Sequence, residues 1–257
     1  MRVVAESEVF PNPTVSKVIF QIRFPDLFYV DSRMGEFQLK VIEMFPVSAL
    51  AVRRQFLIAE VGPTWDAETF QKDAEPTTKL WQFKSANEKI TLEVASNSLS
   101  VHSSEHKSYN NPKVGLRFRD CVRHATEAFF TLVPVPRLTR VGLRYIDDCP
   151  VPSLDDGQFR EWYNTTFPLD RFCLGGAREM MFHTTVARGD YGLRFTESLV
   201  HDDPPKLRLD FDAFATDIPA GECLDVTDRL HELLTDEWKR SIKGPVYDYM
   251  RKEPGHA

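Results

Sequence analysis

The stretch at residues 138–148, LTRVGLRYIDD, lies just past the middle of the chain and determines how the rest is interpreted. Apolar residues occupy every second position there, and the positions between them are polar or glycine: Val141, Leu143 and Tyr145 against Arg140, Gly142 and Arg144. This period of two is typical of a strand with one buried face. The stretch VIFQIRF at residues 18–24 has the same period. Each half of the chain is therefore predicted to begin with a similar strand.

In the first half, the strand is followed by a predicted helix, four strands and a second helix. Asp31 or Ser32 is the predicted cap of the first helix, because apolar residues at helical spacing follow it. Asn111 is the predicted cap of the second helix, with Pro112 in its first turn. Residues 62–79 are predicted to form a surface loop. The four strands are predicted at 52–61, 80–84, 89–95 and 98–102, the last two as a hairpin.

The second half repeats this order with one strand fewer. After a strand at 139–147, Ser153 and Asp156 have the spacing of a capping box and predict a helix. A last helix is predicted from about Asp225, and Gly244 is predicted to end or kink it. Three strands between these helices are predicted at 178–187, 191–198 and 206–214, separated by turn-forming sequences.

The repeated order predicts an α+β protein made of two tandem β-α-β(3-4)-α repeats. Its amphipathic helices and alternating strands indicate an antiparallel sheet with helices on one face and an open second face. The order resembles the repeat of the TATA-binding-protein fold, although a shared topology alone does not imply a shared function. The predicted halves are residues 1–136 and 137–257, joined by the stiff segment VPVPR in one continuous domain.

Composition limits the possible functions. The chain of 257 residues has a net charge of -6, so it has no general excess of positive charge for binding nucleic-acid backbones. The N-terminal sequence is unlike a signal peptide, and no stretch approaches the ~18 apolar residues of a membrane span. We expect a cytoplasmic protein with no membrane segment, no metal and no cofactor. Its widely spaced cysteines fit neither a zinc site nor a disulfide framework: Cys121, Cys149, Cys173 and Cys223.

Polar positions of the predicted sheet form the candidate site: Arg23, Arg144, Arg194, Arg208 and Asp210. Arginines on one face can form a bidentate site for phosphate or carboxylate. The same residues can also be cross-strand ion pairs on a solvated face, and this structural interpretation is favoured because such pairs keep open faces soluble. If the face binds an anionic partner, Arg23 and Arg144 are the expected contacts, because they occupy equivalent places in the two halves.

No catalytic signature stands out in the sequence. GxSxG, HExxH and phosphate-binding glycine loops are absent, and His183 is a lone imidazole on a predicted strand. The sequence thus favours a binding protein over an enzyme and predicts no catalytic residue. Three functional classes stay open: a protein that binds a protein partner or forms a homodimer, a nucleic-acid-binding protein that uses the open face, and a small-ligand binder or unrecognised hydrolase.

Residues 12–24, NPTVSKVIFQIRF, resemble the N-terminal signature of a sporadically distributed, uncharacterised prokaryotic family. Trp81 to Phe83 and the sequence GLRYI at 142–146 resemble later motifs of that family. The family has glutamates at the positions of Lys17 and Gln21 and a proline at that of Thr14. If those glutamates carry an activity in the family, this chain lacks it. The resemblance implies no known substrate or reaction.

Overall fold

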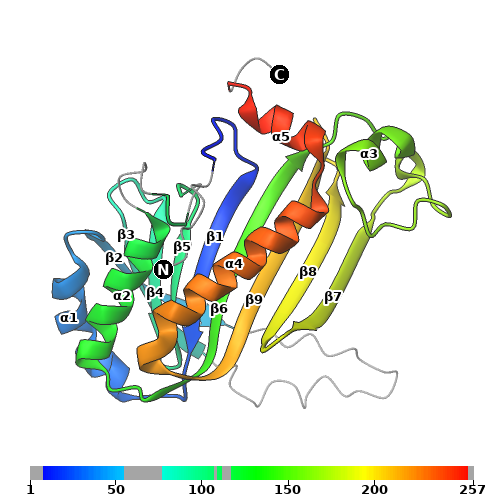
Figure 1. Ribbon diagram of the computed structural model, residues 1–257. Coiled ribbons are helices and arrows are strands. Elements are labelled where there is room, and N and C mark those ends of the chain that lie inside the picture. Colours follow the sequence, from blue (N-terminus) through cyan, green and yellow to red (C-terminus); the bar gives the residue numbers. More distant parts are fainter. Residues whose placement is uncertain (1–7, 55–76, 107–108, 112–116, 254–257) are drawn as a thin grey trace, which may run out of the picture.

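A computed structural model describes residues 8–54, 77–106, 109–111 and 117–253. Its strands form one antiparallel sheet of nine strands in the order β2-β3-β4-β5-β1-β6-β9-β8-β7, which confirms the α+β class (Figure 1). The strands are β1 (Val15–Arg23), β2 (Val47–Arg54), β3 (Thr77–Lys84), β4 (Ile90–Ala95), β5 (Ser98–Ser103), β6 (Arg137–Pro150), β7 (Met181–Arg188), β8 (Tyr191–Val200) and β9 (Lys206–Pro219).

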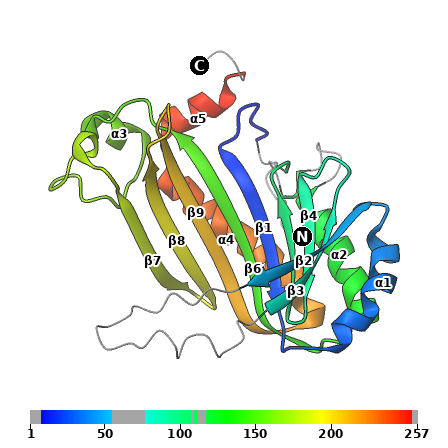
Figure 2. The same ribbon diagram turned by 180° about the vertical axis from the view of Figure 1, so that it is seen from behind.

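Helices cover one face of this sheet. Figure 1 shows α1 and α2 beside the strands of the first half and α4 lying diagonally across β6 and β9. Seen from behind, in Figure 2, the strands lie in front of α4. Among the described residues, none of the helices combines the length and the apolar composition that a membrane span requires. The α-helices are α1 (Tyr29–Val41), α2 (Phe118–Leu132), α3 (Asp156–Trp162), α4 (Cys223–Ser241) and α5 (Gly244–Arg251).

The central pair of strands explains why the core forms where it does. On β1, Phe20 and Ile22 are fully buried, and their partners on β6 are Leu143 and Val141, also fully buried. These four side chains point toward the helices, because alternate residues of a strand point to opposite faces. The period of two at residues 138–148 is thus confirmed as a strand with one buried face.

The strands of the two halves lie on opposite sides of the β1–β6 pair. β2 to β5 lie beyond β1, and β7 to β9 lie beyond β6. The prolines Pro134 and Pro136 fall between α2 and β6, in the segment predicted to join the halves. In the sheet, Arg23 is paired with Arg140, and Arg144 with Ile19. The tandem repeat and the likeness to the TATA-binding-protein topology stay predictions.

The predicted cap of α1 at Asp31 or Ser32 is wrong, because α1 begins before both residues. Val30 in the first turn is fully buried, so packing places this turn in the helix. The Asp31 carboxylate instead accepts hydrogen bonds from Lys79 and from the indole of Trp81 on β3. Tertiary contacts therefore override the local capping preference.

The predicted start of α2 is also wrong. The helix begins at Phe118, after an extended Arg117, and so Asn111 does not cap it. Asn111 is buried, and Pro112 lies outside the described residues. The backbone N–H of Arg119, in the first turn, donates instead to the carbonyl of Tyr109.

In α3 the cap is Asp155 rather than Ser153. The Asp155 side chain accepts from the backbone N–H of Gln158, which satisfies a donor of the first turn. The Ser153 hydroxyl accepts from the backbone N–H of Asp155 and thereby helps to shape the entry to the helix.

The predicted strands agree with the observed ones except at their ends. β2 begins at Val47 rather than at residue 52, and the predicted residues 55–61 lie outside the described residues. Of the predicted loop at 62–79, residues 77–79 belong to β3 and the others are not described. The β4–β5 hairpin is confirmed. β9 continues to Pro219, and Gly244 marks the start of α5.

Candidate functional site

The open face of the sheet, opposite the helices, carries a row of residues that includes two glycines. Strand register places Gln21 on β1 beside Gly142 on β6, Gly142 beside Phe214 on β9, and Phe214 beside Gly192 on β8. We call these four residues the glycine row. Charged residues occupy the rows on both sides of it, with Arg23 and Arg140 on one side and Arg144, Asp212 and Arg194 on the other.

The two glycines leave room that neighbouring side chains fill. A Cβ atom on Gly142 would lie 2.2 Å from Nη1 of Arg140, and one on Gly192 would lie 2.3 Å from Cζ of Phe214. The guanidinium of Arg140 and the ring of Phe214 therefore lie low against the sheet, over the glycines. Any larger residue in either place would force these groups outward.

Arg140 and Arg194 lie at both the Phe214 ring and the Asp212 carboxylate, and Arg23 is the register partner of Arg140 on β1. We call Arg23, Arg140 and Arg194 the arginine cluster. Nη2 of Arg140 donates to Oδ1 of Asp212 at 2.5 Å, and Nη1 of Arg194 lies 4.0 Å from Oδ2 of Asp212. The guanidinium carbons of Arg140 and Arg194 lie 5.1 and 5.4 Å from the centroid of the Phe214 ring, within the range of cation–π contacts.

Positive charge is in excess within this cluster. Nε of Arg23 donates to the neutral amide oxygen of Gln21 at 2.9 Å, and among the described residues Arg23 has no carboxylate partner. Burial lowers the pKa of Arg140, the charges of Arg23 and Arg194 lower it further, and Asp212 opposes both effects. A guanidinium nevertheless stays protonated at any working pH. Two cations therefore share the carboxylate of Asp212, and Arg23 adds a third positive charge beside them, which favours an added anion.

The other predicted arginines are already paired. Arg144 donates through Nε and Nη2 to both oxygens of Asp210, and Arg208 donates through Nε and Nη2 to both oxygens of Asp148. These hydrogen bonds are the largest cause of the raised pKa of each arginine. The interpretation as cross-strand ion pairs is confirmed for Arg144 and Arg208, whereas Arg23 and Arg194 lie in the arginine cluster.

Sequence reasoning did not select Arg140 and Phe214 as site residues. Arg140 follows the same alternation as Arg144, so the signal for it was present in the sequence. Phe214 falls in the same period-two phase as Asp210 and Asp212, which predicts the open face. An aromatic residue in a strand is normally assigned to the core, so Phe214 was not assigned to the open face despite its period-two phase.

The β4–β5 side of the open face carries a serine, a histidine and a glutamate. Nε2 of His102 lies 3.0 Å from the hydroxyl of Ser100 and 3.4 Å from Oε2 of Glu93. A catalytic triad needs one ring nitrogen for the nucleophile and the other for the carboxylate. Because both contacts use the same nitrogen, this trio lacks the geometry of a triad.

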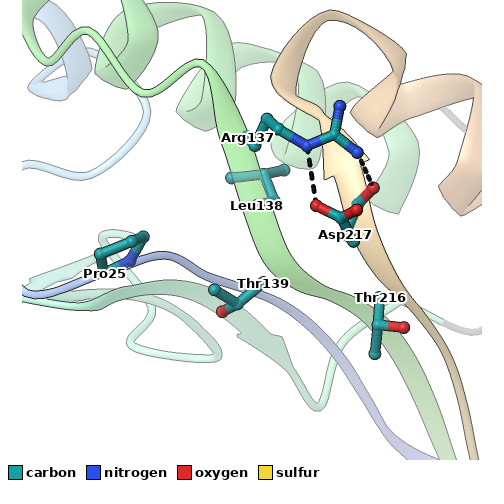
Figure 3. Close-up of a pocket in the computed structure, with 6 residues that line it drawn as sticks. All are labelled: Pro25, Arg137, Leu138, Thr139, Thr216 and Asp217. Atoms are coloured by element: carbon teal, nitrogen blue, oxygen red, sulfur yellow. Dashed lines mark hydrogen bonds and ion pairs between the residues drawn. The ribbon is translucent and has the colours of Figure 1, made fainter.

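A shallow pocket of about 370 Å³ opens where β6 begins and β9 ends, beside Pro25 (Figure 3). In it, Nε of Arg137 donates to Oδ1 of Asp217 at 2.7 Å, and both side chains are exposed. Thr216, which also lines the pocket, is the register partner of Arg140. The pocket therefore adjoins the arginine cluster along the same strands.

Comparison with protein-family models and with curated protein sequences found no match for this chain. The resemblance of residues 12–24 to the prokaryotic family stays a prediction.

Proposed function

We propose that this protein is a binding protein that takes an anionic partner on the open face of its sheet, at the arginine cluster. One observation carries the proposal: the guanidinium groups of Arg140 and Arg194 share the carboxylate of Asp212, and the positive charge of Arg23 lies close enough to Arg140 to lower its pKa. Cations that repel one another in a partly desolvated place are stabilised by a bound anion, and planar guanidinium groups match phosphate and carboxylate geometry.

The charge of the surrounding face supports this proposal. The chain as a whole has a net charge of -6, yet on the open face of β1, β6, β8 and β9 arginines outnumber aspartates. A local field of this kind raises the concentration of anions near the surface even when the net charge is negative. These side chains are Arg23, Arg140, Arg144, Arg194 and Arg208 against Asp148, Asp210 and Asp212.

Inorganic polyphosphate is a suitable probe, because it offers anionic charge without bases or carboxylates. We expect calorimetric titration at low salt to show binding that weakens with added salt, and the double variant Arg23→Gln with Arg194→Gln to bind at least tenfold more weakly. Arg160→Gln is the matched control, since Arg160 on α3 forms an exposed ion pair with Asp170. A wild-type protein that does not bind polyphosphate, or a double variant that binds it like the control, contradicts the proposal.

A second candidate function is homodimer formation through β7. This strand is an edge of the sheet, and residues 181–187 contain no Asp, Glu, Lys, Arg or Pro, the residues that normally protect an edge from pairing. Met181 is 60 % exposed and Phe182 36 % exposed. An antiparallel β7–β7 pair would satisfy the free backbone groups of both copies. Light scattering across a concentration series tests it: Thr185→Lys should leave a monomer, and a wild type that is monomeric throughout excludes this candidate.

A further inference from the structure

The glycine row and the arginine cluster together suit one class of anionic partner. We propose that they bind single-stranded nucleic acid, with a base stacked at Phe214 and the adjoining phosphate held by the arginine cluster. This inference rests on the proposed function and names its ligand. It is carried by the combination of a planar ring, flat guanidinium groups and excess positive charge in one place on an open sheet.

The arginine cluster supplies the phosphate site. Arg23 and Arg140 are register partners on adjacent strands, and both contact the amide oxygen of Gln21, at 2.9 Å from Nε of Arg23 and 3.5 Å from Nη1 of Arg140. Arg194 approaches the same region from β8, through Asp212. Donors of Arg23 and Arg140 therefore meet at one oxygen atom, which allows both to bind one phosphate group, and Arg194 extends the positive charge across the glycine row.

Phe214 supplies the stacking site. Its ring is partly buried and lies over Gly192, with two guanidinium groups within cation–π distance. Bases of single strands stack on aromatic rings and on the planes of arginine side chains. Because the glycines hold the ring and the Arg140 guanidinium low, a base can approach the sheet closely at this row.

The pocket beyond Thr216 extends the site along the strands. Its volume of about 370 Å³ is within the ~300 to 1,000 Å³ range of small-ligand sites, and Thr139 and Thr216 line it with hydroxyl groups. These hydroxyls suit the sugar and phosphate oxygens of a neighbouring nucleotide, whereas the Arg137 guanidinium in this pocket is paired with Asp217. A ligand that spans both places has at least two connected nucleotides.

Two other macromolecules fit less well. An acidic peptide would satisfy the guanidinium groups but makes no use of the ring that two of them flank. A double helix keeps its bases stacked on one another, so it presents no free base face to Phe214. Single-stranded nucleic acid uses both features at once.

The test is fluorescence anisotropy with the full chain and labelled 12-nucleotide oligothymidylate, compared with a duplex of equal length and with polyglutamate. The wild type should prefer the single strand. Phe214→Leu, which removes the aromatic face and keeps an apolar side chain, should weaken oligothymidylate binding about five- to hundredfold, the contribution of one stacked base. The same variant should weaken polyphosphate binding much less than oligothymidylate binding, because polyphosphate has no base to stack. Phe172→Leu is its control, because Phe172 is an exposed ring in the segment after α3.

Arg23→Gln provides a second variant that does not depend on Phe214. It should lower the slope of log affinity against log salt by about 0.7, as expected for the loss of one phosphate contact to a single strand. If oligothymidylate binding is absent while polyphosphate or polyglutamate binds, the nucleic-acid inference fails and the anion-binding function stands. If none of these probes binds, both fail. Equal binding of oligothymidylate by wild type, Phe214→Leu and Arg23→Gln, with all three folded in thermal melts, also overturns the inference.

Discussion

Asp212→Asn should make the protein less stable and at the same time a better binder of anions. The carboxylate of Asp212 is the only one that contacts two members of the arginine cluster among the described residues, at Arg140 and Arg194. Asparagine keeps the shape of the side chain and one oxygen acceptor but removes the negative charge. The variant therefore separates the structural role of this residue from its electrostatic effect on a ligand.

Both effects have magnitudes that follow from the structure. The side chains of Arg140 and Asp212 are 16 % and 17 % exposed, so they form a partly desolvated charged hydrogen bond, whose loss costs about 1 to 3 kcal/mol of folding free energy. For a phosphate bound at the cluster we take a separation of ~6 Å from Asp212. At an effective dielectric constant of ~20 to ~80, their repulsion is about 0.7 to 3 kcal/mol. Removing it should tighten binding about three- to hundredfold.

Urea unfolding measures the first effect, and polyphosphate titration at low ionic strength measures the second, since salt screens the repulsion. Asp170→Asn is the matched control: it makes the same change of charge at a side chain that is 95 % exposed and paired with Arg160. We expect this control to change stability by less than ~1 kcal/mol and binding very little. If folded Asp212→Asn binds polyphosphate no more tightly than wild type, anions do not bind at the arginine cluster.

Three further predictions concern the fold that supports this face. Burial lowers the pKa of His231 from 6.5 to about 4, so the folded state binds the proton less well than the unfolded state. The free energy of unfolding should therefore fall by about 3 kcal/mol as pH falls from above 6.5 to below 4. Urea unfolding across this pH range checks the prediction, because His231→Gln should lack that part of the pH dependence. If the stability of wild type and of His231→Gln changes equally with pH, the imidazole is not buried and neutral. Gly192→Ala should cost about 1 to 3 kcal/mol of folding free energy in the same assay, because the new methyl group collides with Phe214. An unchanged midpoint of urea unfolding would show that the Phe214 ring moves freely. Trp238→Ala should cost ~3 to 5 kcal/mol of folding free energy, because the Trp238 indole of α4 packs against Tyr247 of α5 with ring centroids 5.8 Å apart. An unchanged thermal melt would contradict this packing.

The sequence by itself determined which residues share a face of each strand. Alternation is a local property of an extended chain, so the period of two at residues 138–148 was sufficient to place Leu143 inside and Arg144 outside. The same logic placed Arg194 and Asp210 on the open face. It also predicted the β4–β5 hairpin, because the polar pair between these strands forms a turn whatever the rest of the chain does.

The tertiary structure alone decided which of these residues meet. Arg140 and Asp212 are 72 positions apart in the sequence, and their contact depends on the register of β6 against β9. A shift of one residue in that register would turn the partner side chains to the opposite face, and no local pattern in either strand specifies it alone. Tertiary packing likewise set the start of α1, where burial of Val30 outweighed the capping preference of Asp31. The sequence therefore predicted the charged face, and the packing of distant strands created the arginine cluster within it.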